Sequence, residues 1–169
     1  YNKIYNGTGY ELLKVGGYTT TSVVDNYGTV RSTETVGDST KLIENADGSI
    51  EEIKTGRYTT DAVNNVYGTL VSQDTAGESY NKIYNGTGYE LLKVGGYTTT
   101  SVVDNYGTVR STETVGDSTK LIENADGSIE EIKTGSYTTE AENNVYGTLV
   151  SQDTAGESYN KIYNGTGYE

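Results

Sequence analysis

Residues 17–30 read Gly-Tyr-Thr-Thr-Thr-Ser-Val-Val-Asp-Asn-Tyr-Gly-Thr-Val, a run rich in Thr and Val that ends in an Asp-x-x-Gly signal. Aspartate at the first position of a type I turn accepts hydrogen bonds from the backbone that follows it. Glycine at the fourth position adopts a positive φ without steric penalty. Because β-branched residues favour a pleated surface, this stretch predicts a strand followed by a tight turn.

The turn signal recurs at steps of 20 residues, with one step of 19 after Asn85. The predicted turns are bounded by Asp25 and Gly28, Asn45 and Gly48, Asn65 and Gly68, Asn85 and Gly88, Asp104 and Gly107, Asn124 and Gly127, and Asn144 and Gly147. A second series consists of Gly17, Gly37, Arg57, Gly77, Gly96, Gly116, Ser136 and Gly156. We interpret it as a second corner, so that each unit is expected to contain two turns.

A longer repeat contains these units. Residues 1–79 recur as residues 80–158, and residues 159–169 repeat residues 80–90. The two full copies differ only at Arg57/Ser136, Asp61/Glu140 and Val63/Glu142. The predicted organisation is therefore two four-unit β repeats, 1–79 and 80–158, and the start of a third copy at 159–169. We expect this to be a window of a longer array, since repeat arrays carry distinctive capping units at their ends.

The predicted fold class is all-β, an elongated, solenoid-like array of units of about 20 residues, and two arrangements fit it. Each unit can be a β-hairpin in a continuous antiparallel sheet, or one coil of a parallel β-helix. With strands about 4.8 Å apart, hairpin units would advance the array by roughly 38 Å per 79-residue copy and parallel coils by roughly 19 Å. Asn45-Ala-Asp-Gly48 is more typical of a chain reversal, which favours hairpins.

The composition excludes several classes of function. The chain has no His, Cys, Met, Trp, Phe or Pro, and its 12 basic and 24 acidic residues give a net charge of −12. Catalysis by a His base or a Cys nucleophile and zinc binding are therefore excluded, and we expect neither an enzyme nor a bound cofactor. The negative charge argues against nucleic acid as a partner. No run of 18 apolar residues occurs, so we expect no membrane span in this segment.

The spacing Gly17-Tyr-Thr-Thr-Thr-Ser-Val-Val-Asp25-Asn-Tyr-Gly28-Thr-Val30 resembles the tyrosine–aspartate (YD, Rhs-type) repeats. The Tyr that precedes Asp in that family is replaced here by Val24. A second resemblance, in the Thr-x-Val and Asn-x-x-Gly corners, is to the repeats of self-associating autotransporter adhesins. Both resemblances extend over the whole chain, and both imply an extracellular bacterial repeat protein.

Two sets of side chains are candidates for ligand binding. Asp47 and Glu51, with their counterparts Asp126 and Glu130, lie in an oxygen-rich turn that would suit a weak calcium site. The alternative interpretation is a solvated turn. The 17 Tyr residues could stack on sugars, or they could supply the large apolar surface that a chain without Phe, Trp and Met lacks.

The sequence therefore predicts a structural segment of a bacterial cell-surface fibre, stalk or adhesin, located outside the cell. It would give length and rigidity, or self-associate into a homo-oligomeric filament. One alternative is a multivalent module that binds surface glycans. The Rhs-type resemblance implies another, part of a toxin shell, although near-identical copies favour a straight array over a closed shell.

Overall fold

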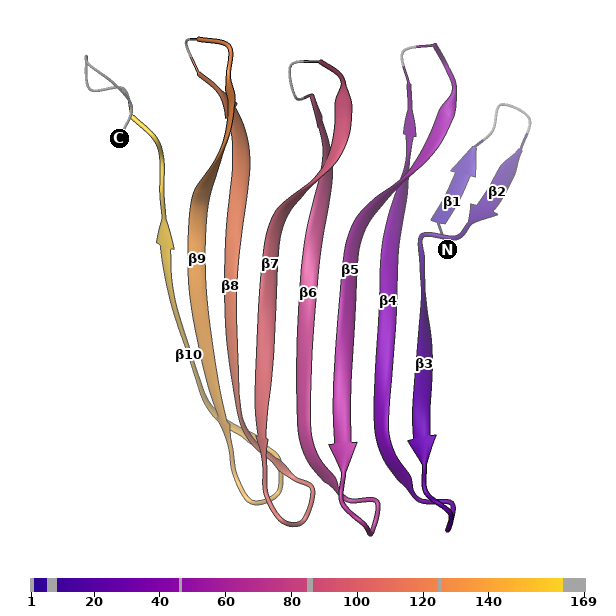
Figure 1. The fold of residues 1–169 in the computed structure, drawn as a ribbon, viewed down its shortest axis with the longest axis vertical. Coiled ribbons are helices and arrows are strands. Elements are labelled where there is room, and N and C mark those ends of the chain that lie inside the picture. Colours follow the sequence, from indigo (N-terminus) through magenta and orange to yellow (C-terminus); the bar gives the residue numbers. More distant parts are fainter. Residues whose placement is uncertain (1, 6–8, 46, 85–86, 125, 163–169) are drawn as a thin grey trace.

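The computed structural model describes residues 2–5, 9–45, 47–84, 87–124 and 126–162. All the regular structure in these ranges is β. The strands are β1 (Asn2–Tyr5), β2 (Tyr10–Leu13), β3 (Gly16–Val24), β4 (Val30–Glu44), β5 (Ile50–Asn64), β6 (Leu70–Tyr84), β7 (Tyr89–Val103), β8 (Val109–Glu123), β9 (Ile129–Asn143) and β10 (Leu149–Ser158). Strands β3 to β10 form one open antiparallel sheet, while β1 and β2 pair separately (Figure 1).

Each 20-residue unit supplies one strand. Strands β4 to β9 are 15 residues long, and a turn separates each strand from the next. The prediction of one hairpin per unit is therefore wrong in its count, because a hairpin takes two units. The antiparallel sheet is confirmed, and the parallel β-helix is wrong for the described residues because all their strand pairs are antiparallel. The four strands of one copy advance the sheet by about 19 Å. This is the advance expected for parallel coils, so the length of a copy does not distinguish a parallel β-helix from an antiparallel sheet with one strand per unit.

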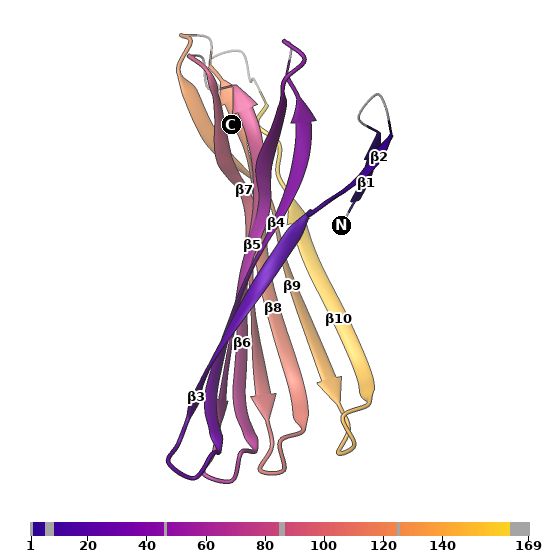
Figure 2. The same ribbon diagram turned by 90° about the vertical axis from the view of Figure 1, so that its right-hand side faces the viewer.

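The sheet is continuous in one half only. Strands β4 and β5 pair along their whole length, from Ser32↔Val63 to Glu44↔Ile50, whereas β5 and β6 pair only from Gly56↔Ser79 to Asn64↔Leu70. The same alternation holds for β6 to β9. The lower half in Figure 1 is thus one sheet, and the upper half consists of two-stranded arms. Figure 2 shows the twist of the sheet, which has the sense and origin common to all β-sheets.

In the part of the chain that the structure describes, the sheet is a single layer without a hydrophobic core. Ile53 is the one buried apolar side chain among the described residues, with 6% of its surface exposed. Val63 is 46% exposed, which explains why the second copy tolerates Glu142 at the equivalent position. Since no second layer covers either face, backbone pairing and contacts along the sheet surface hold the strands together.

The second glycine series lies in the middle of the strands and forms no turns, so its interpretation as a corner is wrong. Its even members alternate across the sheet with tyrosines, as in Gly37↔Tyr58, Tyr58↔Gly77 and Gly77↔Tyr97. We call this line the Tyr–Gly row; it consists of Tyr18, Gly37, Tyr58, Gly77, Tyr97, Gly116, Tyr137 and Gly156. A Cβ added to Gly37, Gly77 or Gly116 would overlap the ring of the next tyrosine. These glycines therefore make room for aromatic rings.

Six of the predicted turns end in a glycine with a positive φ. Gly28, Gly48, Gly68, Gly107, Gly127 and Gly147 have φ between 77° and 86°. Gly88 does not belong with them, because its φ is not in the positive region. The pair Tyr84↔Tyr89 encloses four residues where Glu44↔Ile50 encloses five, and this shorter loop accounts for the single step of 19. Asn85 lies outside the described residues.

Gly28 and Gly88 offer a matched test of the turn geometry. No atom lies within 4 Å of the position that a Cβ would take at either glycine, so only φ distinguishes them. Gly28→Ala is expected to destabilise the sheet by roughly 1 kcal/mol, because an alanine there must adopt a positive φ. Gly88→Ala is expected to change the free energy of unfolding by only a few tenths of a kcal/mol. Urea unfolding of the two variants measures the difference, and equal values would contradict the turn assignment.

Candidate functional site

The lower turns are built around a single acceptor side chain. Asp25 Oδ1 accepts hydrogen bonds from the backbone N–H groups of Tyr27 (2.9 Å) and Thr29 (3.0 Å). The Gly28 N–H donates to the Asp25 carbonyl at 3.1 Å, and the Asp25 N–H donates to the Thr29 carbonyl at 2.9 Å. Asn65, Asp104 and Asn144 make the same bonds in their own turns. An aspartate and an asparagine are therefore interchangeable as acceptors here.

The upper turns have a different acceptor. Asp47 Oδ1 accepts the Ser49 N–H at 3.0 Å and the Ser49 hydroxyl at 2.6 Å, while Asn45 Nδ2 donates to Ser49 Oγ at 3.1 Å. Asn124, Asp126 and Ser128 repeat this arrangement. The predicted turn residues Asn45 and Asn124 thus donate a hydrogen bond to the same serine hydroxyl that bonds the aspartate two positions ahead of each of them.

The calcium candidates already have partners of their own. Glu51 forms an ion pair with Lys82 and Glu130 forms one with Lys161, which link β5 to β6 and β9 to the segment after β10. Asp47 and Asp126 are engaged by serines in their turns. No three acidic side chains in the described ranges are grouped so that they could hold a metal ion. Each calcium candidate is thus engaged in a contact within the sheet or its turn.

Four tyrosines lie at the tips of the lower turns. Tyr27, Tyr67, Tyr106 and Tyr146 are 95%, 86%, 90% and 87% exposed. The turns that carry them lie at the same edge of the sheet, at the bottom of Figure 1. Neighbouring tips are two strands apart, so they are spaced by about 10 Å. This is the most exposed aromatic surface in the described part of the chain.

One face carries a line of carboxylates, which we call the acidic row. It comprises Glu34, Asp61, Asp74, Glu113, Glu140 and Asp153, and Thr100 interrupts it between Asp74 and Glu113. All six are exposed, and none of the ion pairs between described residues includes one of them. Like charges opposite each other on neighbouring strands repel, so this row opposes the pairing of the strands that carry it.

The opposite face carries an uncharged row of threonines, which lies two residues from the Tyr–Gly row. It comprises Thr20, Thr35, Thr60, Thr75, Thr99, Thr114, Thr139 and Thr154, one on each strand. Their hydroxyls bond in pairs, for example Thr60 to Thr75 at 2.9 Å and Thr99 to Thr114 at 2.8 Å. The hydroxyls therefore satisfy each other across the strands.

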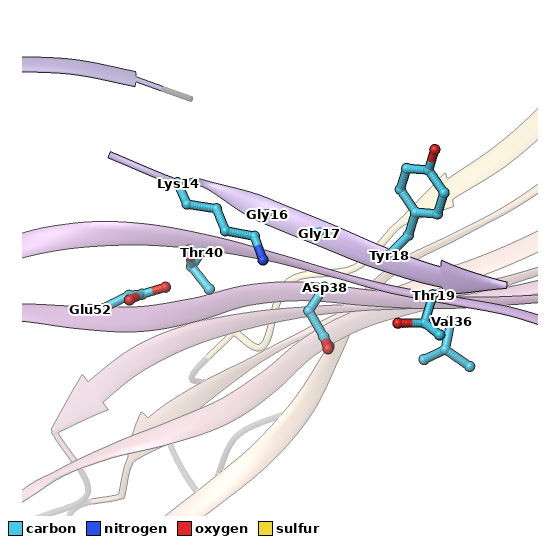
Figure 3. A pocket seen from close by; sticks show the side chains of 9 residues that line it. All are labelled: Lys14, Gly16, Gly17, Tyr18, Thr19, Val36, Asp38, Thr40 and Glu52. Carbon is cyan, nitrogen blue, oxygen red and sulfur yellow. The ribbon is translucent and has the colours of Figure 1, made fainter. Parts of the chain in front are cut away.

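A shallow hollow of about 360 Å³ lies where β3 meets β4 and β5 (Figure 3). Its lining includes Lys14 just before β3, Gly17 and Tyr18 in β3, and Asp38 in β4. Figure 3 shows Tyr18 on one face of the sheet and Thr19 and Val36 on the other. The hollow is open to solvent, and its lining also includes the carboxylate of Glu52 from β5.

The Tyr–Gly row and the acidic row were missed at the sequence level, although a signal for them exists. Once the turns at Asp25 and Asn45 fix where each strand begins, counting back from each turn gives the partners across the sheet as far as a β-bulge. The register shifts by one residue between Ser39 and Thr40, and only with that shift included does the count place Tyr58 beside Gly37 and Asp61 beside Glu34. Reading the second glycine series as turns halved the strand length and hid these partners.

Comparisons with known proteins give no relatives. No family profile, curated protein or solved structure matches the chain. The described ranges hold no helix long and apolar enough to cross a membrane.

The turn carboxylates link stability to pH. The N–H groups of Thr29 and then Tyr27, with Arg31 nearby, lower the pKa of Asp25, and Thr108, Tyr106 and Arg110 do the same for the pKa of Asp104. A lowered folded-state pKa contributes stability above the unfolded value of about 3.9 and loses it as the pH falls through the folded value.

We therefore expect the double variant Asp25→Asn, Asp104→Asn to be nearly as stable as the parent at neutral pH, because Asn65 and Asn144 perform the same role uncharged. Below about pH 4 the variant should lose less stability than the parent. Urea unfolding across this pH range measures the difference. Identical acid sensitivity of the two proteins would contradict the assignment.

Proposed function

We propose that this chain is a structural repeat segment that gives length and rigidity to a bacterial surface fibre, stalk or adhesin outside the cell. The observation that carries the proposal is the repeated register. Strands β7, β8 and β9 pair through the same residues as β3, β4 and β5, each number being raised by 79. A further copy can therefore extend the sheet without any change in its geometry.

Contacts in the sheet are local, which suits extension. In the described sheet each strand pairs only with the strands before and after it in sequence. The stability of such an array is a sum of unit terms and neighbour terms, so that added copies do not require new long-range contacts. The continuous part of the sheet, represented by residues Gly56 to Asn64 of β5, is about 30 Å wide. The width resists bending in the plane of the sheet.

The extracellular location rests on sequence properties. The chain lacks Cys and Met, the residues most easily oxidised. The resemblance to YD repeats and to autotransporter adhesin repeats supports the same location. The exposed rows of Thr, Tyr and carboxylates are compatible with a surface that is in contact with water on both faces.

Growth in length is the direct test of this function. Tandem chains of two, four and six 79-residue copies are expected to add about 19 Å per copy along one axis and to keep the same sheet width. Small-angle scattering and electron microscopy measure both dimensions. Copies that collapse into separate globules, or a width that grows with copy number, would overturn the proposal.

A second candidate function is multivalent glycan binding at the lower edge. The tyrosines at the turn tips favour it, because they are exposed and their spacing of about 10 Å is similar to one disaccharide of an extended polysaccharide. Weak sites repeated along an edge gain affinity through avidity.

This function predicts that insoluble or arrayed polysaccharides retain the parent chain. Retention should be lost when Tyr27, Tyr67, Tyr106 and Tyr146 are all changed to Ser. Tyr10→Ser is the matched control, because it removes an exposed tyrosine that lies outside the lower edge. Equal retention of both variants, or no retention of the parent, would exclude the tips as a binding surface.

A further inference from the structure

We infer that two copies of this chain join end to end, with β10 of one copy pairing with β3 of the next in the register of β6 and β7. The inference deepens the proposed structural function, on which it rests, by naming the partner of the sheet edges. Both edges are unpaired in the described structure, since the strand order runs from β10 to β3 and ends there. Unpaired edge strands are templates for pairing with another chain.

The two edges have the sequences of strands that already pair within the chain. Residues 149–158 of β10 are identical to residues 70–79 of β6, and residues 16–24 of β3 are identical to residues 95–103 of β7. Strands β6 and β7 pair from Ser72↔Val102 to Ser79↔Gly95. The same register between two copies would run from Ser151↔Val23 to Ser158↔Gly16.

At the β3 edge, Tyr18 lacks the neighbouring strand that covers its counterpart inside the sheet. Tyr18 is 74% exposed, whereas Tyr97, which lies over Gly77, is 38% exposed. Gly156 of an incoming copy would take the place of Gly77 and complete the Tyr–Gly row. Lys14 lies over Gly17 as Lys93 lies over Gly96.

The charges at the two edges are complementary. Within the chain, Lys93 Nζ is 3.2 Å from Glu78 Oε1. In the proposed contact, Lys14 would meet Glu157, the counterpart of Glu78. Because the two surfaces differ, the contact is head-to-tail and produces an open filament unless its rotation closes a ring.

Gly156 permits a variant that acts on the contact and spares the monomer. Within one copy, a Cβ at Gly156 has its closest neighbour at 3.3 Å, the Ser136 carbonyl, whereas a Cβ at the equivalent Gly77 would overlap a tyrosine ring. Gly156→Ala therefore requires the Ser136 carbonyl to shift by only a few tenths of an ångström within one copy, whereas it should clash with Tyr18 of the next copy. In the Tyr18→Ala background, which has no ring, the same change should have no further effect.

Sedimentation of the purified 169-residue chain over a range of concentrations is the first test. The parent is expected to form open-ended oligomers, and Gly156→Ala to raise the concentration of half-association by at least about tenfold. Gly88→Ala is the matched control and should leave association unchanged. A parent that stays monomeric, or association insensitive to Gly156→Ala, would overturn the inference.

The register is tested by cross-linking, since the chain has no native cysteine. Ser22 and Gln152 of two copies would be direct partners, as Ser101 and Gln73 are within the chain. A mixture of Ser22→Cys and Gln152→Cys should form a disulfide between copies. Ser22→Cys mixed with Asp153→Cys should not, because residue 153 points to the other face. Linkage of the second mixture alone, or of neither, would overturn the register. The structural function is tested separately, by the length of the tandem chains of two, four and six copies.

Discussion

Backbone pairing between strands that follow each other in sequence is the interaction on which this structure depends. A sheet with a single layer has no interior, and here only Ile53 is buried among the apolar side chains of the described part. The stabilisation that a core would provide must come from the sheet surface itself. The Tyr–Gly row provides part of it, because the rings of Tyr58, Tyr97 and Tyr137 cover the glycine backbone of the preceding strand.

The turns could be predicted from the sequence because their chemistry is local. Asp25 and Gly28 act within five residues, so the spacing Asp-x-x-Gly is sufficient to identify them. The mid-strand glycines could not be recognised in the same way. Gly37 is required by Tyr58, a residue 21 positions ahead that becomes its neighbour only when the sheet forms. A glycine that makes room for a ring and a glycine that reverses the chain have the same letter in the sequence.

The candidate sites show the same limit. Asp47 and Glu51 are close in sequence, which suggested a shared cation, but the strand geometry directs Glu51 to Lys82 on the neighbouring arm. The acidic row was missed for the opposite reason, because Glu34, Asp61 and Asp74 are far apart in sequence and adjacent in the sheet. Side chains on neighbouring strands meet by register, and the register depends on strand length, which the doubled turn count had obscured.

The alternation of strand direction has a consequence for how such an array can change its length. Tyrosine strands and glycine strands alternate, so the smallest piece that can be inserted or removed while every row stays intact is a pair of strands. Loss of one strand, such as β4, would place Tyr18 opposite Arg57. In all later strands it would also move the lower turns to the upper end of the sheet and the upper turns to the lower end. The 79-residue copy contains four strands, an even number. Gain or loss of a whole copy by recombination would therefore lengthen or shorten the array. It would conserve the chemistry of both faces of the sheet and of both ends that carry the turns.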